Sequence, residues 1–311
     1  MKLEPRDFNR VSFSNADSVK AKLKNQVIKN GRLFQDELVA YCLERTIYRI
    51  SISKYNENFT LKGGIFLYAI FDGEFSRSTR NIDLLAKSLE NEVEVIRKVF
   101  QEIFAIESDD AIKYKTEAMS INIITEFKEY HGINIKVMAM LDKTAIPVSI
   151  DIGFGDVVYP ERIMMEFPVL LEMNVPKIYA YSLTSVIAEK FEAIVSLGYA
   201  NSRYKDFYDI YLLCNQFDYD SLELSIAIME TFKHRKTMME DIVIFEDEFS
   251  KDRTRNMRWK SFVSKKRAMI QIELTEAIDG IENFLRPIIE GIRNENYYVA
   301  KWKHEERIWI P

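Results

Sequence analysis

Residues 61–87 read LKGGIFLYAIFDGEFSRSTRNIDLLAK, and this stretch decides the predicted fold. A short strand is followed by the paired glycines Gly63 and Gly64 and then by the apolar run 65–71, which predicts a short buried helix. Glycine can adopt backbone angles that a side chain forbids, so the turn can bring main-chain N–H groups close to a phosphate. Because the positive end of the helix lies beside the glycines, an anion is expected to bind at this turn.

A second strand is predicted over residues 81–86, NIDLLA, whose apolar end is typical of the centre of a sheet. Asn81 and Asp83 are separated by one residue, so their side chains lie on the same side of this strand. Their oxygens are therefore predicted to lie side by side and to face a metal ion. A carboxylate and an amide carbonyl can both bind a hard divalent cation, but only the carboxylate brings a negative charge.

The order of these features resembles the nucleotidyltransferase superfamily of DNA polymerase beta, whose signature is a Gly-Gly or Gly-Ser turn followed by an Asp-x-Asp strand. A narrower likeness covers Lys62-Gly63-Gly64 and residues 77–85, RSTRNIDLL, which resemble the AbiEii-type abortive-infection toxins of bacterial toxin–antitoxin systems. In that family the second pattern is usually Arg-x-Thr-x-Asp-Ile-Asp, so Asn81 stands where the first Asp is expected. The resemblance implies nucleotide transfer from an NTP, with Mg²⁺ as the cofactor.

The chain has 311 residues, of which 47% are hydrophobic, so it can bury a substantial core in one large domain or two smaller ones. No apolar run is long enough to span a bilayer, and the start, MKLEPRDFNR, lacks the features of a signal peptide, so a cytoplasmic protein with no membrane partner is expected. Cys42 and Cys214 are expected to be buried thiols. The net charge of -5 gives no general attraction to nucleic acid, so RNA binding requires a local basic surface.

Three further strands are predicted at 119–127, 133–139 and 148–152, and with the strand at 81–86 they form a mixed sheet. Asp151 lies within the third of them, where burial of an isolated carboxylate is costly, so it needs a partner. By resemblance, Asp151 is the third carboxylate that completes the metal site of the superfamily. The alternative is a carboxylate at a strand edge that accepts hydrogen bonds from the backbone.

Prolines interrupt residues 160–176, after a predicted surface turn at Asp156, and helical patterns dominate from there to the end of the chain. The domain boundary is placed near Ala180. Residues 1–180 are predicted to form a nucleotidyltransferase domain, and residues 181–311 a helical domain that completes the active-site cleft. The predicted fold class is therefore α/β (α+β), with a nucleotidyltransferase-like mixed sheet flanked by helices and a C-terminal helical domain.

A helix is predicted from Ser182, a suitable N-cap, to Leu197, with Gly198 ending it. Lys190 lies among apolar residues of this helix, and a buried ammonium requires an anion. The predicted anion is the triphosphate of the NTP, in which case Lys190→Met would weaken NTP binding and change the folding stability little. The alternative is that the Lys190 stem follows the helix flank and its ammonium reaches water.

The next helix opens at residues 201–210, where Arg203, Asp206 and Asp209 fall on nearly one face. These residues and the helix that carries Lys190 resemble the third and fourth motifs of the AbiEii-type toxins. By this resemblance, Lys190 and Arg203 neutralise the triphosphate, while Asp206 or Asp209 orients Lys190 or the acceptor. The alternative is that both carboxylates pair with basic neighbours in their own helix.

Residues 251–267 carry eight Lys or Arg side chains and one Asp, a local charge of +7, with Trp259 and Phe262 among them. Basic and aromatic side chains together suit the backbone and the unstacked bases of a single-stranded RNA end. The predicted RNA contacts are Arg255, Arg258 and Lys260. The alternative is a solvated helix face whose two aromatic side chains point into the core.

The predicted function is that of a nucleotidyltransferase toxin that transfers a nucleotide from an NTP to an acceptor. By resemblance, the acceptor is the 3′ end of tRNA and the partner is an AbiEi-type antitoxin. The predicted metal ligands are Asn81, Asp83 and Asp151, and the predicted nucleotide contacts are Lys62, Gly63, Gly64, Arg77, Lys190 and Arg203. The predicted catalytic residues are Asp83, Asp151, Lys190, Asp206 and Asp209. The alternatives are a nucleotide- or RNA-binding homologue that Asn81 impairs in catalysis, and a small-molecule nucleotidyltransferase.

Overall fold

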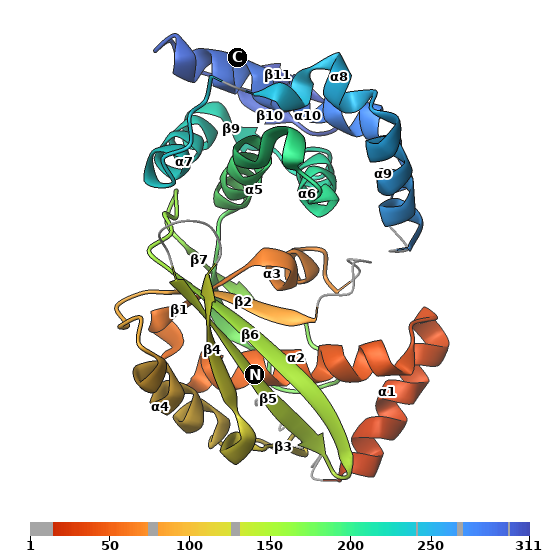
Figure 1. Ribbon diagram of the computed structural model, residues 1–311. Coiled ribbons are helices and arrows are strands. Elements are labelled where there is room, and N and C mark those ends of the chain that lie inside the picture. The colour runs from red at the N-terminus through yellow and green to blue at the C-terminus, as the bar shows by residue number, and fades with distance from the viewer. Residues whose placement is uncertain (1–14, 74–79, 126–130, 241, 266–269, 298) are drawn as a thin grey trace, which may run out of the picture.

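The main β-sheet is the centre of the first part of the chain in the computed structural model, which describes residues 15–73, 80–125, 131–240, 242–265, 270–297 and 299–311 (Figure 1). Within these residues the sheet has eight strands, which are β1 Phe59–Lys62, β2 Asn81–Ala86, β3 Ile112–Tyr114, β4 Ser120–Thr125, β5 His131–Leu141, β6 Thr144–Phe154, β7 Ile163–Glu166 and β8 Lys177–Ala180. Their order is β3-β5-β6-β2-β1-β8-β7, and β4 pairs with β5. The helices of this part are α1 Ala16–Asn30, α2 Phe34–Ile52, α3 Gly63–Ile70 and α4 Val93–Phe104.

The sheet is mixed, as predicted. Strand β2 is antiparallel to β1 and parallel to β6, while β1 is parallel to β8 and β5 is antiparallel to β6. The register places Asp83 of β2 opposite Asp151 of β6, and Asp151 opposite Asn134 of β5. These three side chains therefore form a row across the centre of the sheet. The strand predicted at 119–127 corresponds to β4, and residues 126–127 lie outside the described residues.

The two faces of the sheet carry different side chains because successive residues of a strand point to opposite sides. Ile82 of β2 and Ile150 and Ile152 of β6 are buried in the core, together with apolar residues of α2 and α4. The other face carries the polar row that begins at Asp83. Figure 1 shows α3 on the side of the sheet that faces α5 (Leu183–Leu197) and α6 (Tyr204–Cys214), with α2 and α4 beyond the sheet.

The second part of the chain is mainly helical. It adds α7 Ser221–His234, α8 Asp247–Ser250, α9 Arg253–Lys265 and α10 Leu274–Arg293 to α5 and α6. Helix α5 begins and ends where it was predicted, because the Ser182 hydroxyl accepts a hydrogen bond from the backbone N–H of Ser185 and Gly198 follows with a positive φ. The last strand of the main sheet ends at Ala180, and the division into two domains near that residue stays a prediction.

A small sheet in this second part was not predicted. It consists of β9 Tyr219–Asp220, β10 Lys301–Lys303 and β11 Ile308–Ile310, with β10 in the middle. Trp302 is buried, and its indole N–H donates to the carbonyl oxygen of Cys214 over 2.6 Å, while Trp309 donates to that of Phe284 over 2.9 Å. These two hydrogen bonds hold residues 302–309 against α6 and α10. Cys214 and Cys42 are buried free thiols, as predicted.

Candidate active site

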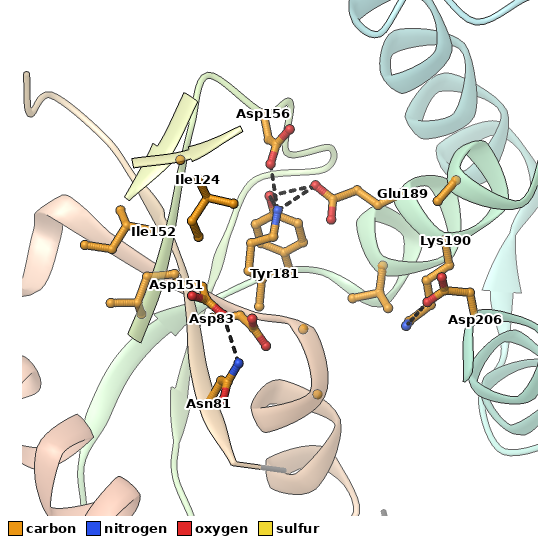
Figure 2. Close-up of a pocket in the computed structure, with 18 of the residues that line it drawn as sticks. Asn81, Asp83, Ile124, Asp151, Ile152, Asp156, Tyr181, Glu189, Lys190 and Asp206 are labelled. Atoms are coloured by element: carbon orange, nitrogen blue, oxygen red, sulfur yellow. Dashed lines mark hydrogen bonds and ion pairs between the residues drawn. The ribbon is translucent and has the colours of Figure 1, made fainter. Parts of the chain in front are cut away.

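A cavity of about 860 Å³ lies between the main sheet and the helices of the second part. Its walls come from both parts of the chain, as the close-up in Figure 2 shows. The cavity brings together nine of the predicted site residues, which are Lys62, Gly63, Gly64, Asn81, Asp83, Asp151, Lys190, Arg203 and Asp206. Residues that are separated by more than a hundred positions in the sequence thus face the same space.

The glycine turn lies against Asp83. Gly63 has a φ of +66°, in the left-handed region that favours glycine, and a Cβ atom at this position would lie 2.2 Å from the Oδ2 atom of Asp83. No side chain can therefore be added at Gly63 without displacing the Asp83 carboxylate. The backbone N–H of Gly64 donates a hydrogen bond to Asp83. One of the free N–H groups at the start of α3 is therefore already bound to a carboxylate.

Asp83 and Asp151 lie opposite each other on the parallel strands β2 and β6. Burial, together with the negative charge of Asp151, raises the pKa of Asp83 to about 6. Within the described residues no group of three or more His, Cys, Asp or Glu side chains could hold a metal ion. The donor set is therefore two carboxylates and the amide of Asn81, which are hard oxygen ligands of the kind that Mg²⁺ prefers. A divalent cation would also relieve the repulsion between the two carboxylates, so these residues fit Mg²⁺.

The Asp151 carboxylate is held by two side-chain amides. Asn81 donates from Nδ2 to Oδ2 of Asp151 over 2.9 Å, and Asn134 donates from Nδ2 to Oδ1 over 2.6 Å (Figure 2 shows the first of these bonds). Strand β6 pairs with β2 on one side and with β5 on the other, so Asp151 does not lie at a strand edge. The predicted need for a partner is confirmed, whereas the alternative of a backbone-bound carboxylate at an edge is wrong.

Lys62 is engaged by carboxylates of the chain itself. Its ammonium lies 2.6 Å from Asp156 and 2.9 Å from Glu189, and it also donates to the Tyr181 hydroxyl over 3.2 Å (Figure 2 labels these three partners). Burial alone would lower the pKa of Lys62, but the charges of Glu189, Tyr181 and Asp156 hold it well above its usual value. Lys62 therefore lies at the predicted place but is already paired with two anions.

Asp156 is not in a surface turn of the predicted kind. Burial would raise the pKa of Asp156, yet the positive charges of Lys62 and Arg235 hold it well below its usual range. Arg235, which follows α7, lies 3.2 Å from both Asp156 and Glu189 and 2.8 Å from Glu192 of α5. These five charged side chains form one network at the rim of the cavity, and we call it the rim network.

Lys190 has the anionic partners that its apolar surroundings require. Its ammonium lies 3.1 Å from Oδ1 of Asp206 and 2.6 Å from Oδ2 of Asp209, and 11% of its side chain is exposed. The alternative of an ammonium that extends to water is therefore wrong. Asp206 also accepts from Nε of Arg203 over 2.8 Å, so the pairing within the helix that was the alternative for the two Asp residues holds for Asp206. Despite burial, Lys190 and Arg203 lower the pKa of Asp206.

The remaining predicted residues lie elsewhere. Arg77 lies outside the described residues, and Asp209 is buried behind Lys190 rather than in the cavity wall. Arg255 donates to the carbonyl oxygens of Tyr199 and Asn201, and its guanidinium lies 4.0 Å from the ring centre of Phe249. Arg255 therefore has structural partners of its own.

The other members of the basic segment are on the surface of α9. Arg258 is exposed, and Lys260 lies 3.4 Å from Glu273 with 62% of its side chain exposed. Trp259 is fully buried and Phe262 packs against the core. The aromatic side chains thus take the core-facing positions of the alternative interpretation, and no aromatic stacking surface for RNA remains at these two positions.

Sequence reasoning missed Asn134 and Arg235. Asn134 lies in an alternating strand, where any polar residue on the open face reads as solvent-exposed. Arg235 follows the end of a helix, where a basic residue is common because it suits the helix dipole. For both residues, the sequence showed only a polar or basic side chain. Their contacts could not be predicted, because the residues that they bind come from distant segments of the chain.

No helix among the described residues is long and apolar enough to cross a membrane.

Comparisons with known proteins found a matching family and several similar structures. A family model described as nucleotidyl transferase AbiEii toxin, type IV TA system, matches residues 45–286. The structure of JHP933 from Helicobacter pylori is 12% identical, with a TM-score of 0.44 over 82% of this chain and 92% of that chain. A presumed nucleotidyltransferase from H. pylori is also 12% identical, with a TM-score of 0.45 over 83% of this chain and 96% of that chain. The comparison with curated proteins gave no match.

Proposed function

Because this chain belongs to the AbiEii nucleotidyl transferase toxin family of type IV toxin–antitoxin systems, we propose that it transfers a nucleotide from an NTP to the 3′ end of a tRNA. Membership of the family makes the chain a nucleotidyltransferase with an NTP substrate and an antitoxin partner. The tRNA acceptor and an AbiEi-type antitoxin are the specific forms that we propose. One observation supports nucleotide transfer: a single cavity unites the carboxylates of Asp83 and Asp151, a glycine turn and the cationic side chains of Lys190 and Arg203.

Asp83, Asp151 and the carbonyl oxygen of Asn81 are the residues that would hold Mg²⁺. When bound, Mg²⁺ would supply positive charge to the phosphates and polarise the α-phosphate. The chain itself fixes the ligands before any nucleotide enters, because Gly64 holds Asp83 and two amides hold Asp151. Such pre-organised ligands do not have to be ordered during the reaction.

The triphosphate is proposed to lie between the start of α3 and the cationic wall formed by Lys190 and Arg203. Gly63 and Gly64 line the cavity at the start of α3, and the N-terminal end of this helix favours negative charge. Asp206 and Asp209 hold the Lys190 ammonium in place by direct ion pairs. Their role in this proposal is to orient Lys190.

In the proposed reaction the acceptor hydroxyl oxygen forms a bond to the α-phosphorus. The bond between that phosphorus and the oxygen bridging to the β-phosphate breaks, pyrophosphate leaves, and the hydroxyl proton passes to solvent. The chain contributes position and charge rather than a covalent intermediate. Positioning and electrostatic stabilisation are the usual contributions of a protein to phosphoryl transfer, because the nucleotide itself provides the leaving group.

The test is to incubate the protein with each α-³²P-labelled NTP, Mg²⁺ and total tRNA, and to follow the label on a denaturing gel. We expect one NTP to label tRNA and Asp83→Ala to reduce the label to the level without protein. Periodate-treated tRNA, which lacks a 3′ hydroxyl, is the matched acceptor control. Label that persists in Asp83→Ala would refute the metal site, and label on periodate-treated tRNA would refute the acceptor.

A second candidate function is supported by Asn81, which gives the site one carboxylate fewer than the usual family pattern. In that case the protein would bind NTP and RNA without transferring the nucleotide. Binding of labelled NTP by the parent, loss of that binding in Lys190→Met, and no labelled acceptor at any Mg²⁺ concentration would identify this function.

A further inference from the structure

A row of polar side chains continues from the two carboxylates across the open face of the sheet. The register aligns Asp83 of β2, Asp151 of β6, Asn134 of β5 and Asn122 of β4. Of these, Asp83 and Asp151 line the cavity, whereas Asn134 is not one of its lining residues. Asn134 nevertheless contacts the site, because it donates to Asp151 over 2.6 Å.

We propose that Asn134 is a positioning residue, which together with Asn81 clamps the Asp151 carboxylate in the orientation that faces Asp83 and a divalent cation. This inference rests on the proposed function, since it assigns Asn134 a role in metal binding. Asn134 acts only through Asp151. It lies on β5, the strand next to the one that carries Asp151.

The clamp fixes the carboxylate because each of its oxygens receives one hydrogen bond. Oδ1 accepts from Asn134 and Oδ2 accepts from Asn81, so rotation of the carboxylate about its Cβ–Cγ bond would break both bonds. Asn134 is itself held, because its amide also donates to the Ser149 hydroxyl over 2.9 Å. The donors come from the strands on either side of β6, whose backbones are joined to it by the sheet.

Electrostatics explain why a clamp is needed. Asp83 and Asp151 are paired in register on neighbouring strands and carry like charges, so an unrestrained Asp151 would turn away from Asp83 when no cation is present. An Asp at position 81 would add a third charge and could not donate to Asp151. Asn81 instead donates from its nitrogen and keeps its carbonyl oxygen for a cation. The amides of Asn81 and Asn134 thus restrain the Asp151 carboxylate, whereas an Asp at position 81 would repel it.

The alternative role for Asn134 is to stabilise the pairing of β5 and β6 without any effect on metal binding. Asn122 supplies the matched control, because it lies next to Asn134 in the same row, has the same side chain and is exposed on β4. Replacing either residue by Ala removes an amide from the same face of the sheet. Only Asn134→Ala removes a donor to Asp151.

The experiment measures Mn²⁺ binding to the nucleotide-free protein, from the electron paramagnetic resonance signal of free Mn²⁺, for the parent, Asn134→Ala, Asn122→Ala and Asp83→Ala. Thermal melts in EDTA report the folding stability of each variant. We expect Asn134→Ala to bind Mn²⁺ about tenfold more weakly, as is typical when the partner of a metal ligand is lost, and Asn122→Ala to bind like the parent. In turnover, excess Mg²⁺ should restore the kcat of Asn134→Ala.

Two results would overturn the inference in different ways. If Asp83→Ala loses Mn²⁺ but Asn134→Ala binds it like Asn122→Ala, then Asn134 is structural and the proposed function is unaffected. If Asp83→Ala also binds like the parent, then the metal site and the proposed function fail together. Asn134→Ser, whose hydroxyl is too short to reach Asp151 but keeps the position polar, replaces Asn134→Ala if the latter does not fold.

Discussion

Lys190 forms ion pairs with two carboxylates of the chain itself, Asp206 and Asp209, whereas its sequence neighbours predicted only that it binds an anion. We predict that Lys190→Met lowers the free energy of unfolding by about 3 kcal/mol, because Asp209, which is fully buried, would lose its cation. The expectation that this substitution changes stability little is revised accordingly. NTP affinity should also fall by at least about tenfold, the cost of one charge-assisted contact. Urea unfolding and NTP titration measure the two effects.

The double variant Lys190→Met with Asp209→Asn separates the two roles. Because Asp209→Asn removes the buried charge that Lys190→Met leaves behind, the double variant should recover part of the lost stability. It should not recover NTP binding. If NTP binding returns along with stability, then Lys190 has only a structural role.

The apolar neighbours of Lys190 were sufficient to predict an anionic partner, but they could not identify it. The partners Asp206 and Asp209 lie on the next helix, and their distance from Lys190 depends on how α5 and α6 pack. The same holds for Asp151, whose need for a partner followed from burial. The amide of Asn134 comes from a strand pairing whose register the sequence pattern does not specify.

At the scale of single elements, α9 divides the predicted RNA contacts into two groups. Arg255 ties the helix to the turn before α6, whereas Arg258 and Lys260 are exposed. We predict that Arg258→Ala with Lys260→Ala weakens RNA binding and reduces the slope of log K against log salt by about 1.4, since each lost phosphate contact to a single strand contributes about 0.7. Binding to labelled tRNA over a salt series measures the slope.

Arg255→Ala is the control for this prediction on the same helix. It should lower the melting temperature by a few degrees, because the carbonyl oxygens of Tyr199 and Asn201 lose their donor. The double variant at Arg258 and Lys260 should melt like the parent. An unchanged salt slope in the double variant would show that α9 does not contact RNA.

Helix α2 carries a buried Glu44 whose titration should be visible in the stability of the protein. Burial raises the pKa of Glu44 to about 7, against the opposing effects of Arg45 and the backbone N–H of Leu170. In the unfolded chain the pKa returns to its ordinary value of 4.5, so the folded state binds the proton more tightly. Stability from this group is therefore lost as the pH rises from 4.5 towards 7, by up to about 3 kcal/mol.

We predict that Glu44→Gln reduces this dependence on pH. The difference in unfolding free energy between the variant and the parent should shift in favour of the variant as the pH rises from 5 to 8. Urea unfolding at several pH values measures it. The same difference at every pH would show that Glu44 is ionised in the folded protein throughout this range.

Elements differ in how well their sequence predicts them. Helix α5 has a capping serine, a closing glycine and an apolar face, and all three signals lie in the helix or directly at its ends. The small sheet of β9, β10 and β11 joins segments that are about eighty residues apart, and each strand has only two or three residues. Strands this short have too few residues to show an alternating pattern, so their pairing emerges only from the fold.

For the whole molecule, the rim network joins the sheet to the helices of the second part. Lys62 and Asp156 belong to the sheet side, Glu189 and Glu192 to α5, and Arg235 follows α7. We predict that Arg235→Met lowers the free energy of unfolding by about 1–3 kcal/mol, because three carboxylates lose a shared cation. Chemical denaturation measures the change.

Lys233→Met is the matched control, since Lys233 is an exposed cation near the end of the same helix. It should leave the stability within about 0.5 kcal/mol of the parent. If both variants lose the same stability, the effect comes from the charge of α7 and not from the rim network. The network could not be predicted, because its members are spread over residues 62–235 and each is an ordinary surface residue type.

The lack of space for a side chain at Gly63 predicts which mutations a genetic selection against toxicity should recover. Every missense change of a glycine codon introduces a side chain, and at this position its first carbon would collide with the Asp83 carboxylate. Cells that survive production of a toxin without its antitoxin are selected for loss of its activity. Among survivors that still make the full-length protein, codon 63 should therefore be substituted more often than codon 31. Gly31 also has a positive φ but lies in open space, so a substitution there strains the backbone without affecting the cavity.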